Sequence, residues 1–322
     1  MNRSVHALLA ALLVACTGLA GAQGWPSKPV RVIVPVPSGT SPDVIGRLFS
    51  ERLGRVFGQG FVVENITGAG GLIASRTVAR AEPDGYTLYF AGTGALITDP
   101  FMIKDLGYDP ERDFAFISMI YSEGSLAVAV HPEVPARTLP EFIAIAKKKP
   151  GSISYGTTNV ALTILFGKWL QKLTETDMVA VAYKAQGQQI QDVLAGRTQM
   201  VIVSPPNIEA FLRAGKLRMI AVDGFKPHPL VPGVETIDKT LPGFHMSGLG
   251  ILAAPTGIAA ATTQRLNSEM DKIVRSPEYI QSLQSMGFMV EGAGTPLSIV
   301  DFLRERRAYW NKVMKGLNVQ PE

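Results

Sequence analysis

The pattern of apolar and polar residues predicts strands and helices that alternate along most of the chain. It begins at Val30, where an apolar run rich in β-branched residues meets a loop of Pro, Ser and Gly, followed by apolar positions at helical spacing. Such a run is typical of a strand buried on both faces of a parallel sheet. Pro35 and Pro37 cannot donate to a neighbouring strand, so the strand ends there. Pro42 suits the first turn of a helix, and a loop that leads into a helix N-terminus favours an anion.

The same unit recurs along the chain. Strands are predicted at 61–65, 86–90, 114–121, 126–130, 153–156, 178–182, 200–203, 217–222 and 247–255. Helices are predicted at 42–56, 72–81, 139–149, 160–173, 188–195, 205–215, 259–275, 277–286 and 296–315. This alternation favours an α/β fold with mainly parallel sheets and right-handed crossovers. The proline-rich stretch 224–242 has little periodicity and is predicted to be a loop.

The order of the elements predicts two lobes. The break at 122–125 between two predicted strands is either a hairpin or a crossing between domains. Three consecutive helices end the chain with no strand between them, so they must cover an existing sheet, most simply that of the first lobe. We therefore expect one lobe from residues 23–123 and 248–322 and a second from 124–247. Two chain crossings between such lobes form a hinge.

Residues 1–22 are predicted to be a signal peptide. Arg3 precedes an apolar run at 7–15 that is too short to span a bilayer. An Ala-Gly-Ala sequence then predicts cleavage before Gln23. A Leu-Val-Ala-Cys sequence also fits a lipoprotein box, which would leave Cys16 acylated. Cleavage before Gln23 is favoured because the folded region starts there directly, and we expect a soluble periplasmic protein.

Composition and charge exclude several classes of function. The 322 residues are 46% hydrophobic and 18% charged, which is typical of a globular protein. The net charge is +4, and the two basic runs, 147–149 and 304–307, lie on helical patterns. They are interpreted as solvated faces rather than nucleic-acid sites. Cys16 is the only cysteine, so no disulfide and no thiol chemistry is expected in the folded part.

Signs of catalysis, metals and cofactors are weak. None of the four histidines stands near another His or Cys at metal-ligand spacing, and neither G-x-S-x-G nor a phosphate-binding G-x-x-x-x-G-K-[ST] loop occurs. The glycines at 68–71 resemble a dinucleotide fingerprint only superficially, because Ile73 occupies a position that needs a small residue. Asp43 has no visible partner for acid–base chemistry. We expect no enzyme, no metal and no cofactor.

Small polar turns follow several predicted strands. They occupy 36–41, 92–95, 157–159 and 204–207. Ligands of open α/β sheets bind outside the carboxyl ends of the strands. Two lobes that face each other with such turns could enclose an anion with backbone N–H groups from both sides, and exclusion of water would strengthen those hydrogen bonds.

A series of motifs resembles the tripartite tricarboxylate transporter substrate-binding family, also called Bug proteins. They are P-S-K-P-V-R-V-I-V-P at 26–35, V-V-E-N-I-T-G-A-G-G at 62–71, P-D-G-Y-T-L at 83–88, Y-D-P-E-R-D-F at 108–114, H-P-E-V-P-A-R-T-L-P-E-F at 131–142, V-A-Y-K at 181–184 and A-G-K-L-R at 214–218. The resemblance implies a two-lobed periplasmic-binding-protein fold of the Venus-flytrap, type II-like kind. It also implies a monomeric receptor that passes a small organic carboxylate to a two-component membrane permease.

The chain departs from the family's pattern at its loops. The first loop of the family usually reads P-F-x-P-G-G-x-x-D, whereas this chain has Val36 for Phe and Ser38 for the first Gly. The turn at 157–159 is followed by apolar residues where relatives often have His-Leu, and Ile-Val-Ser at 202–204 replaces a common Phe-Asp-Asn. The pocket has therefore lost an acidic and an aromatic position. We predict a carboxylate ligand with an apolar or aromatic body.

The predicted ligand contacts come from both lobes. They are Pro37, Ser38, Gly39, Thr40, Ser41, Asp43, Thr93, Gly94, Ala95, Thr157, Thr158, Asn159, Ala185, Val203 and Ser204. One ligand carboxylate is expected to meet the backbone N–H groups of 38–41, and a second acceptor to meet 157–159. Asp43 would repel a carboxylate, so it faces a hydroxyl, an amine or water, or it supports the loop. A sensor that presents its closed state to a membrane histidine kinase is the alternative function, and a periplasmic hydrolase is the third.

Overall fold

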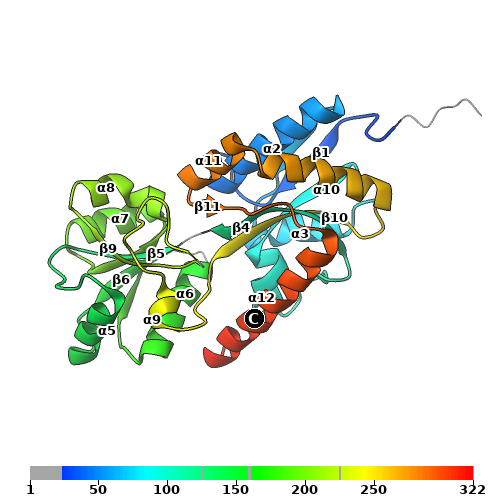
Figure 1. Cartoon of the computed structure of the whole chain (residues 1–322). Helices are drawn as coiled ribbons and strands as arrows, with labels where there is room; N and C mark the ends of the chain where they lie inside the picture. The colour runs from blue at the N-terminus through cyan, green and yellow to red at the C-terminus, as the bar shows by residue number, and fades with distance from the viewer. Residues whose placement is uncertain (1–23, 125, 159–160, 225, 322) are drawn as a thin grey trace, which may run out of the picture.

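The computed structural model describes residues 24–321, except for 125, 159–160 and 225, and shows two β-sheets surrounded by helices (Figure 1). The first sheet has the strand order β11-β4-β10-β3-β1-β2, and the second has the order β7-β6-β8-β5-β9. The first sheet is built from β1 (Val30–Val34), β2 (Phe61–Asn65), β3 (Thr87–Gly92), β4 (Phe114–Gly124), β10 (Gly248–Pro255) and β11 (Phe288–Met289). The second is built from β5 (Ala127–Val130), β6 (Ser154–Thr157), β7 (Val179–Ala182), β8 (Met200–Val203) and β9 (Arg218–Val222).

The helices divide into two groups by chain order. The group that goes with the first sheet comprises α2 (Ser41–Phe57), η1 (Ala69–Gly71), α3 (Leu72–Ala79), η2 (Gly94–Thr98), α4 (Asp99–Met102), α10 (Ala260–Val274), α11 (Pro277–Ser285) and α12 (Pro296–Gly316). The group that goes with the second sheet comprises α5 (Leu139–Lys148), α6 (Ala161–Thr174), α7 (Gln186–Leu194), η3 (Pro205–Ile208), α8 (Glu209–Arg213) and α9 (Ile237–Thr240).

Both sheets are mixed, and their parallel parts are the units that the sequence predicts. Strands β2, β1 and β3 are parallel, and so are β7, β6 and β8. By contrast, β10 is antiparallel to β3 and β4, and β5 is antiparallel to β8 and β9. These antiparallel strands are the ones that the chain enters from the other sheet. The expectation of mostly parallel sheets therefore holds for the βα units and not for the strands at the crossings.

The break expected at 122–125 is not a hairpin, because β4 continues to Gly124 and β4 and β5 belong to different sheets. The chain therefore crosses between the sheets after β4. The chain comes back to the first sheet at β10. The sequence did not indicate η2 and α4, where it suggested a turn, nor the short elements α9 and β11. Short helices directly after a strand carry too few apolar positions to show a period.

The helix ends follow ordinary capping chemistry. Helix α2 ends at Gly58, which has a φ of 68° and whose N–H donates to the Gly54 carbonyl. Thr295 and Ser298 form a reciprocal capping box at the start of α12. At α5 the Thr138 hydroxyl accepts from the N–H of Glu141 as its spacing predicts, with an oxygen–nitrogen distance of 3.4 Å.

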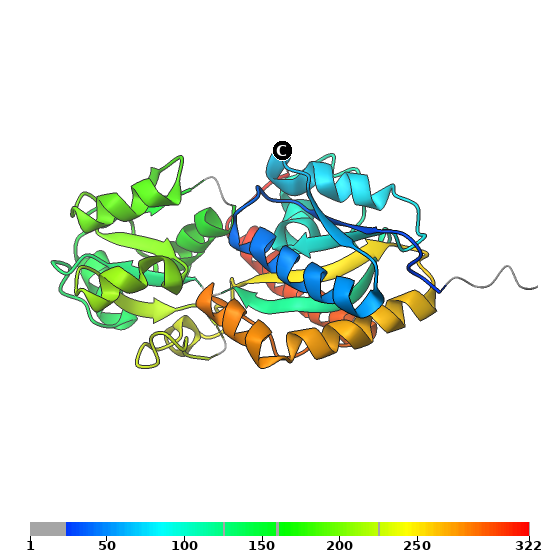
Figure 2. The same ribbon diagram turned by 90° about the horizontal axis from the view of Figure 1, so that it is seen from above.

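Helix α12 connects the elements of the two sheets. A Cβ added at Gly316 of α12 would lie 2.5 Å from the Trp169 ring of α6, so the two helices pack closely there. Arg306 of α12 is 7% exposed and donates from Nη2 to the carbonyl of His245, at 2.8 Å, on the segment that leads into β10. One cluster of buried apolar side chains runs from the first sheet through α12 and α6 into the second. Figure 2 shows the two groups of elements side by side, with the start of α2 (blue) directed toward the second group.

Candidate ligand-binding site

The loop between β1 and α2 is held by a buried carboxylate. Asp43, in the first turn of α2, is 1% exposed. Its Oδ1 accepts from Nη2 of Arg47 at 2.9 Å and from Nδ2 of Asn65 at 2.8 Å. Its Oδ2 accepts from Nε of Arg47 at 3.0 Å and from the backbone N–H of Gly39 at 2.9 Å. Asp43 thereby joins the loop, the helix and the end of β2.

These partners keep Asp43 ionised. Burial raises its pKa, but the hydrogen bonds from Arg47, Gly39 and Asn65 and the charge of Arg47 outweigh burial and lower the pKa from 3.8 to about 2. The same Asn65 Nδ2 also donates to the carbonyl of Val36 at 2.9 Å. A carboxylate accepts about four hydrogen bonds, and this one already has them. Of the roles that the sequence leaves open for Asp43, the contacts favour support of the loop.

Two of the backbone N–H groups predicted to meet a ligand are engaged inside the loop. The N–H of Gly39 donates to Asp43, and that of Thr40 donates to the carbonyl of Pro37 at 3.4 Å. Gly39 has a φ of 85°, a conformation that glycine adopts without strain, and this tight turn directs its N–H inward. These two N–H groups would have to give up their partners in the loop to bind a carboxylate, and the ligand contacts predicted for 38–41 stay a prediction. Ser38, which is exposed, and Ser41, which is half-buried, remain as candidates.

Among the predicted site residues, Thr93 is the one that lies close to segments far away in the sequence. It follows β3, and its Oγ1 accepts from the N–H of Leu249 at 2.9 Å. A Cβ added at Gly248 would lie 3.5 Å from Thr93 Oγ1 and 3.8 Å from Cδ2 of Leu162. Leu162 is in the first turn of α6, just after the turn at 157–159. The sequence interpretation did not select Gly248, and it noted Leu162 only as an apolar substitute.

Gly94 and Ala95 open η2 beside Thr93. Ala95 is 7% exposed and packs in the core, and its carbonyl accepts from Tyr108 Oη at 2.9 Å. A Cβ added at Gly94 would lie 3.3 Å from Oδ1 of Asp99, which is half-buried. Burial raises the pKa of Asp99 to about 6. The backbone of Gly94 can therefore face the site, whereas the side chain of Ala95 is used for packing.

The turn after β6 is only partly described. Thr157 is 6% exposed, and its hydroxyl donates to the carbonyl of Val181 in the neighbouring strand at 3.5 Å. Thr158 is half-buried, and Asn159 lies outside the described residues. The Thr157 side chain thus belongs to the sheet, and any contact of this turn with a ligand would come from its later residues.

The remaining second-lobe residues have different roles. Ala185 is exposed and caps α7. Val203 is fully buried in a cluster with Ala127 and Ile208, so its side chain packs in the core. The ligand contact predicted for Val203 stays a prediction, and only its backbone could make it. An all-apolar run at 200–203 cannot show from sequence which side chains face a ligand.

Gln189 of α7 is a further polar residue that the sequence did not single out. It is 1% exposed, and its Nε2 donates to the carbonyls of Gly156 at 3.0 Å and Ile202 at 3.4 Å. A Cβ added at Gly156 would lie 2.3 Å from Cγ of Gln189, so only glycine permits this approach. Gln189 therefore holds the ends of β6 and β8 together. A glutamine on an amphipathic helix normally faces solvent, and no sequence signal marks this one.

Ser204 lies at a contact between the two groups of elements. A Cβ added at Gly287, between α11 and β11, would lie 2.2 Å from Oγ of Ser204 and 3.0 Å from Cδ of Pro206. The Nζ of Lys226, which follows β9, forms an ion pair of 3.0 Å with Glu291, which follows β11. The ligand contact predicted for Ser204 stays a prediction.

Within 24–321, apart from the gaps already named, no group of three His, Cys, Asp or Glu side chains could hold a metal ion. Across that same part of the chain, no helix combines the length and the apolar character needed to cross a bilayer.

Comparison with known protein families places this architecture. The model of the tripartite tricarboxylate transporter family receptor matches residues 34–319, which include the loop before α2 and every strand of both sheets after β1. The chain belongs to this receptor family. Its members are substrate-binding receptors and not enzymes, and the resemblance seen in the sequence motifs is confirmed.

Relatives of the receptor family match nearly the whole chain. A UPF0065 protein of Bordetella bronchiseptica is 33% identical over 317 residues, which cover 98% of this chain and 93% of that protein. BugT of Bordetella pertussis is 26% identical, with 98% of each chain covered. An R. palustris protein solved with adipate has a TM-score of 0.79 at 27% identity, covering 93% of this chain and all of that chain, 100%. The predicted two-lobed α/β fold is confirmed by this likeness.

Proposed function

We propose that this chain is an exported periplasmic receptor that binds a small organic carboxylate between two lobes and delivers it to a two-component membrane permease. The proposed lobes are residues 23–123 with 248–322, and residues 124–247, after removal of the signal peptide 1–22. The observation that carries the proposal is the approach of Thr93, Gly248 and Leu162 from three separate segments. Membership of a receptor family supports it.

The chemistry of these segments suits a carboxylate with an apolar body. The hydroxyl and N–H of Ser41 lie at the start of α2, where the helix dipole favours negative charge. Leu162 presents an apolar methyl group near Gly248, so a hydrocarbon segment of the ligand can pack there. The R. palustris relative was solved with adipate, which is itself a dicarboxylate with an aliphatic middle.

Calorimetry with a panel of adipate, benzoate, malate and citrate tests the ligand class. We expect adipate or benzoate to bind at least about tenfold more tightly than citrate, since burying even a few methylene groups is worth about 1–3 kcal/mol. Binding of citrate alone would contradict the apolar body. Binding of none of the four, together with a different ligand found by native mass spectrometry of the purified protein, would contradict the carboxylate class.

A glycine series tests the location. Gly248→Ala should be tolerated because its Cβ makes ordinary contacts, whereas Gly248→Val should fill the space beside Thr93 and Leu162 and weaken binding about tenfold or more. Gly233→Val is the matched control, since a Cβ added there meets nothing within 4 Å. Equal affinities in both valine variants would place the ligand elsewhere.

Delivery needs a separate measurement. Uptake of the bound carboxylate by cells that express the permease, with and without the receptor, should require the receptor. A normal uptake rate without it, combined with ligand-dependent activation of a membrane histidine kinase, would favour the sensor function instead.

A further inference from the structure

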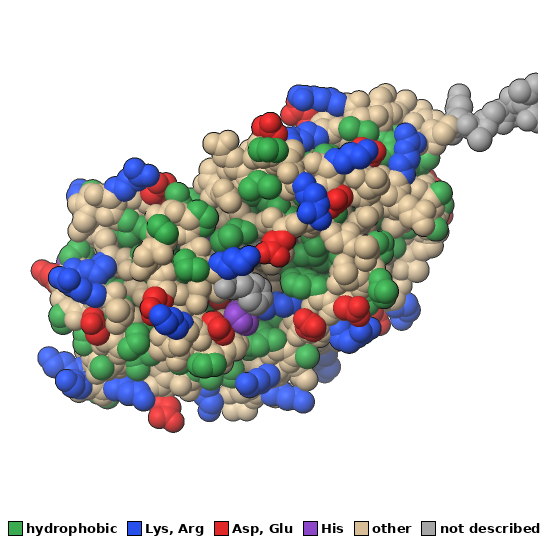
Figure 3. All heavy atoms as spheres, in the orientation of Figure 1, with side chains coloured by type: hydrophobic (Ala, Val, Ile, Leu, Met, Phe, Trp, Pro, Cys, Tyr) green, Lys and Arg blue, Asp and Glu red, His purple; other side chains and the backbone are tan. Residues whose placement is uncertain are grey.

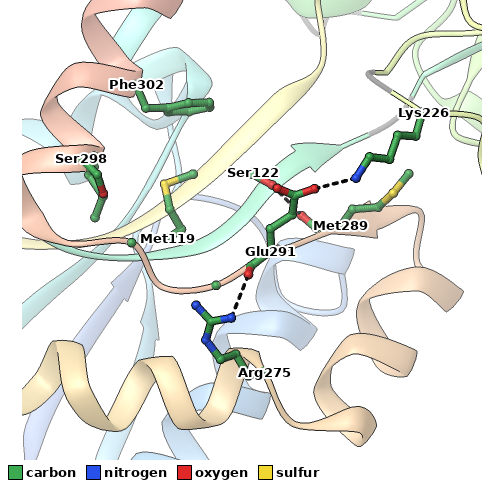
Figure 4. A pocket seen from close by; sticks show the side chains of 11 residues that line it. Met119, Ser122, Lys226, Arg275, Met289, Glu291, Ser298 and Phe302 are labelled. Atoms are coloured by element: carbon green, nitrogen blue, oxygen red, sulfur yellow. Dashed lines mark hydrogen bonds and ion pairs between the residues drawn. The ribbon is translucent and has the colours of Figure 1, made fainter.

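A second hollow lies on the other side of β10 from Thr93. Its volume is about 630 Å³, and it is enclosed by β4, the loop after β11 and the first turns of α12, together with Lys226 from the segment after β9 (Figure 4). Figure 3 shows a hollow with hydrophobic side chains in it near the middle of this face. None of the residues that line it is predicted to bind the carboxylate, so it is a separate site.

The inner surface of the hollow is apolar and adaptable. Met119 and Ile299 are 7% and 1% exposed, and Met289 and Phe302 are half-buried around them. Thioether side chains are flexible and make favourable contacts with aromatic rings. The volume falls within the range of about 300–1,000 Å³ that is typical of sites for small molecules. The hollow therefore suits one ring-sized apolar body.

The polar groups of the inner surface are already satisfied. The hydroxyl of Ser122 donates to the carbonyl of Met289 at 3.3 Å. The hydroxyl of Ser298 serves the capping box of α12 and donates to the carbonyl of Thr295 at 3.0 Å. Recognition of a polar group must therefore take place at the rim.

Lys226 is the cation at the rim that can change partner. Arg275 is fixed, because its Nε donates to both carboxylate oxygens of Asp271 at 2.9 Å and its Nη1 donates to the carbonyl of Glu291 at 3.3 Å. The side chains of Lys226 and Glu291 are 74% and 81% exposed, so their ion pair contributes little and is easily exchanged. An anion at the rim can take the place of the Glu291 carboxylate.

We propose that this hollow binds a compact molecule with one aromatic or alicyclic body and a single anionic group. The ring packs between Met119, Met289 and Phe302, and the anionic group binds Lys226 in place of Glu291. Lys226 comes from the second group of elements and the rest of the hollow from the first. A ligand bound in the hollow therefore contacts both groups of elements. Its affinity for the hollow and the separation of the two lobes are consequently linked.

The reporter for this site is 5-(dimethylamino)naphthalene-1-sulfonate, a dye with one fused aromatic body and one sulfonate group, whose fluorescence increases when it leaves water. In protein labelled at the methionine ε-methyl groups, the dye should shift the NMR signals of Met119 and Met289 and leave those of Met102 and Met270 unchanged. Met270 is fully buried in a different core cluster. Shifts confined to other methionines, or no binding at all, would overturn the proposal.

Substitutions at the rim should act with opposite signs. Lys226→Ala should weaken the dye about fivefold by removing a charged donor, whereas Glu291→Gln should strengthen it by releasing Lys226. Lys239→Ala is the matched control, because Lys239 forms a similar exposed ion pair with Glu235. Equal effects of the two lysine substitutions would show that only general charge matters.

A substitution in the inner surface completes the test. Phe302→Ala should weaken the dye about tenfold, since the ring supplies much of the apolar contact. Phe57→Ala removes a half-buried ring far from the hollow, beside Trp25, and should leave dye binding unchanged. Loss of binding in both variants, or in neither, would contradict the assignment.

Discussion

Replacement of Asp43 by Asn tests whether the loop before α2 is braced by charge. The amide keeps the size of the side chain but puts an NH₂ group in place of one oxygen. At Oδ1 this group would face donors from Arg47 and Asn65, and at Oδ2 it would face donors from Arg47 and Gly39. In either orientation the NH₂ group faces N–H donors from which it cannot accept, so hydrogen bonds are lost at a buried position.

The magnitude follows from the pKa and from the hydrogen bonds. A pKa lowered from 3.8 to about 2 means that ionised Asp43 stabilises the folded state by about 2 kcal/mol. This stability is present above the unfolded pKa near 3.8 and is lost as the pH falls toward 2. Unpaired buried donors cost about 1–3 kcal/mol more. The side chain of Arg47 is 50% exposed and can still bind water, so the total loss of stability in Asp43→Asn is limited to about 2–4 kcal/mol.

Urea unfolding at neutral pH measures this loss, with Glu64→Gln as the matched control. Glu64 makes the same kind of pair with Arg31, but its side chain is 44% exposed, so its loss should cost at most about 1 kcal/mol. Carboxylate affinity should fall in Asp43→Asn and not in Glu64→Gln, because only the first releases the loop. The reasoning is refuted if the two variants lose equal stability or if Asp43→Asn binds the carboxylate as tightly as the unchanged protein.

Three further outcomes are expected. Burial raises the pKa of Asp99 from 3.8 to about 6, so the free energy of unfolding should fall by about 3 kcal/mol as the pH rises through this window. Urea midpoints measured across the window should show this fall, and Asp99→Asn should abolish it. Gly287→Ala should weaken carboxylate binding because its Cβ would meet Ser204, whereas Gly58→Ala, with a similar positive φ but open space, should lower only the melting temperature. Gly316→Ala should destabilise the protein by about 1–3 kcal/mol in urea, because its Cβ would overlap the ring of Trp169; unchanged stability would mean that α12 and α6 are not held together there.

The main elements could be predicted because their signals are local. The run that starts at Val30 and the Thr-Pro pair that starts α12 each carry a strand or helix signal within a few residues. The crossing after β4 could only be narrowed to two alternatives, because a break of four small or polar residues looks the same in a hairpin and in a linker. Pairing with β10, which lies far along the chain, decides between them.

The candidate site was less predictable because its contacts join distant segments. Arg47 stands four residues after Asp43 on the predicted helix, so this partner could have been recognised from sequence, whereas Asn65 is reached only when β2 pairs with β1. Gly248 lies close to both Thr93 and Leu162 only because the chain crosses between the sheets twice. A loop sequence shows which groups could bind an anion, but it does not show which of them the fold has already used.

The contacts between the two sheets differ in the energy needed to separate them. Arg306 is buried and donates to the carbonyl of His245, and Trp169 packs against α12, so parting these groups would expose apolar area and leave buried polar groups unsatisfied. The Lys226–Glu291 pair is exposed, and water replaces it with little loss. If the angle between the sheets changes, α12 and α6 should therefore act as the pivot, and the contact between Lys226 and Glu291 should open or close. A ligand in the second hollow lies beside that contact, where small contacts have the most influence on the angle.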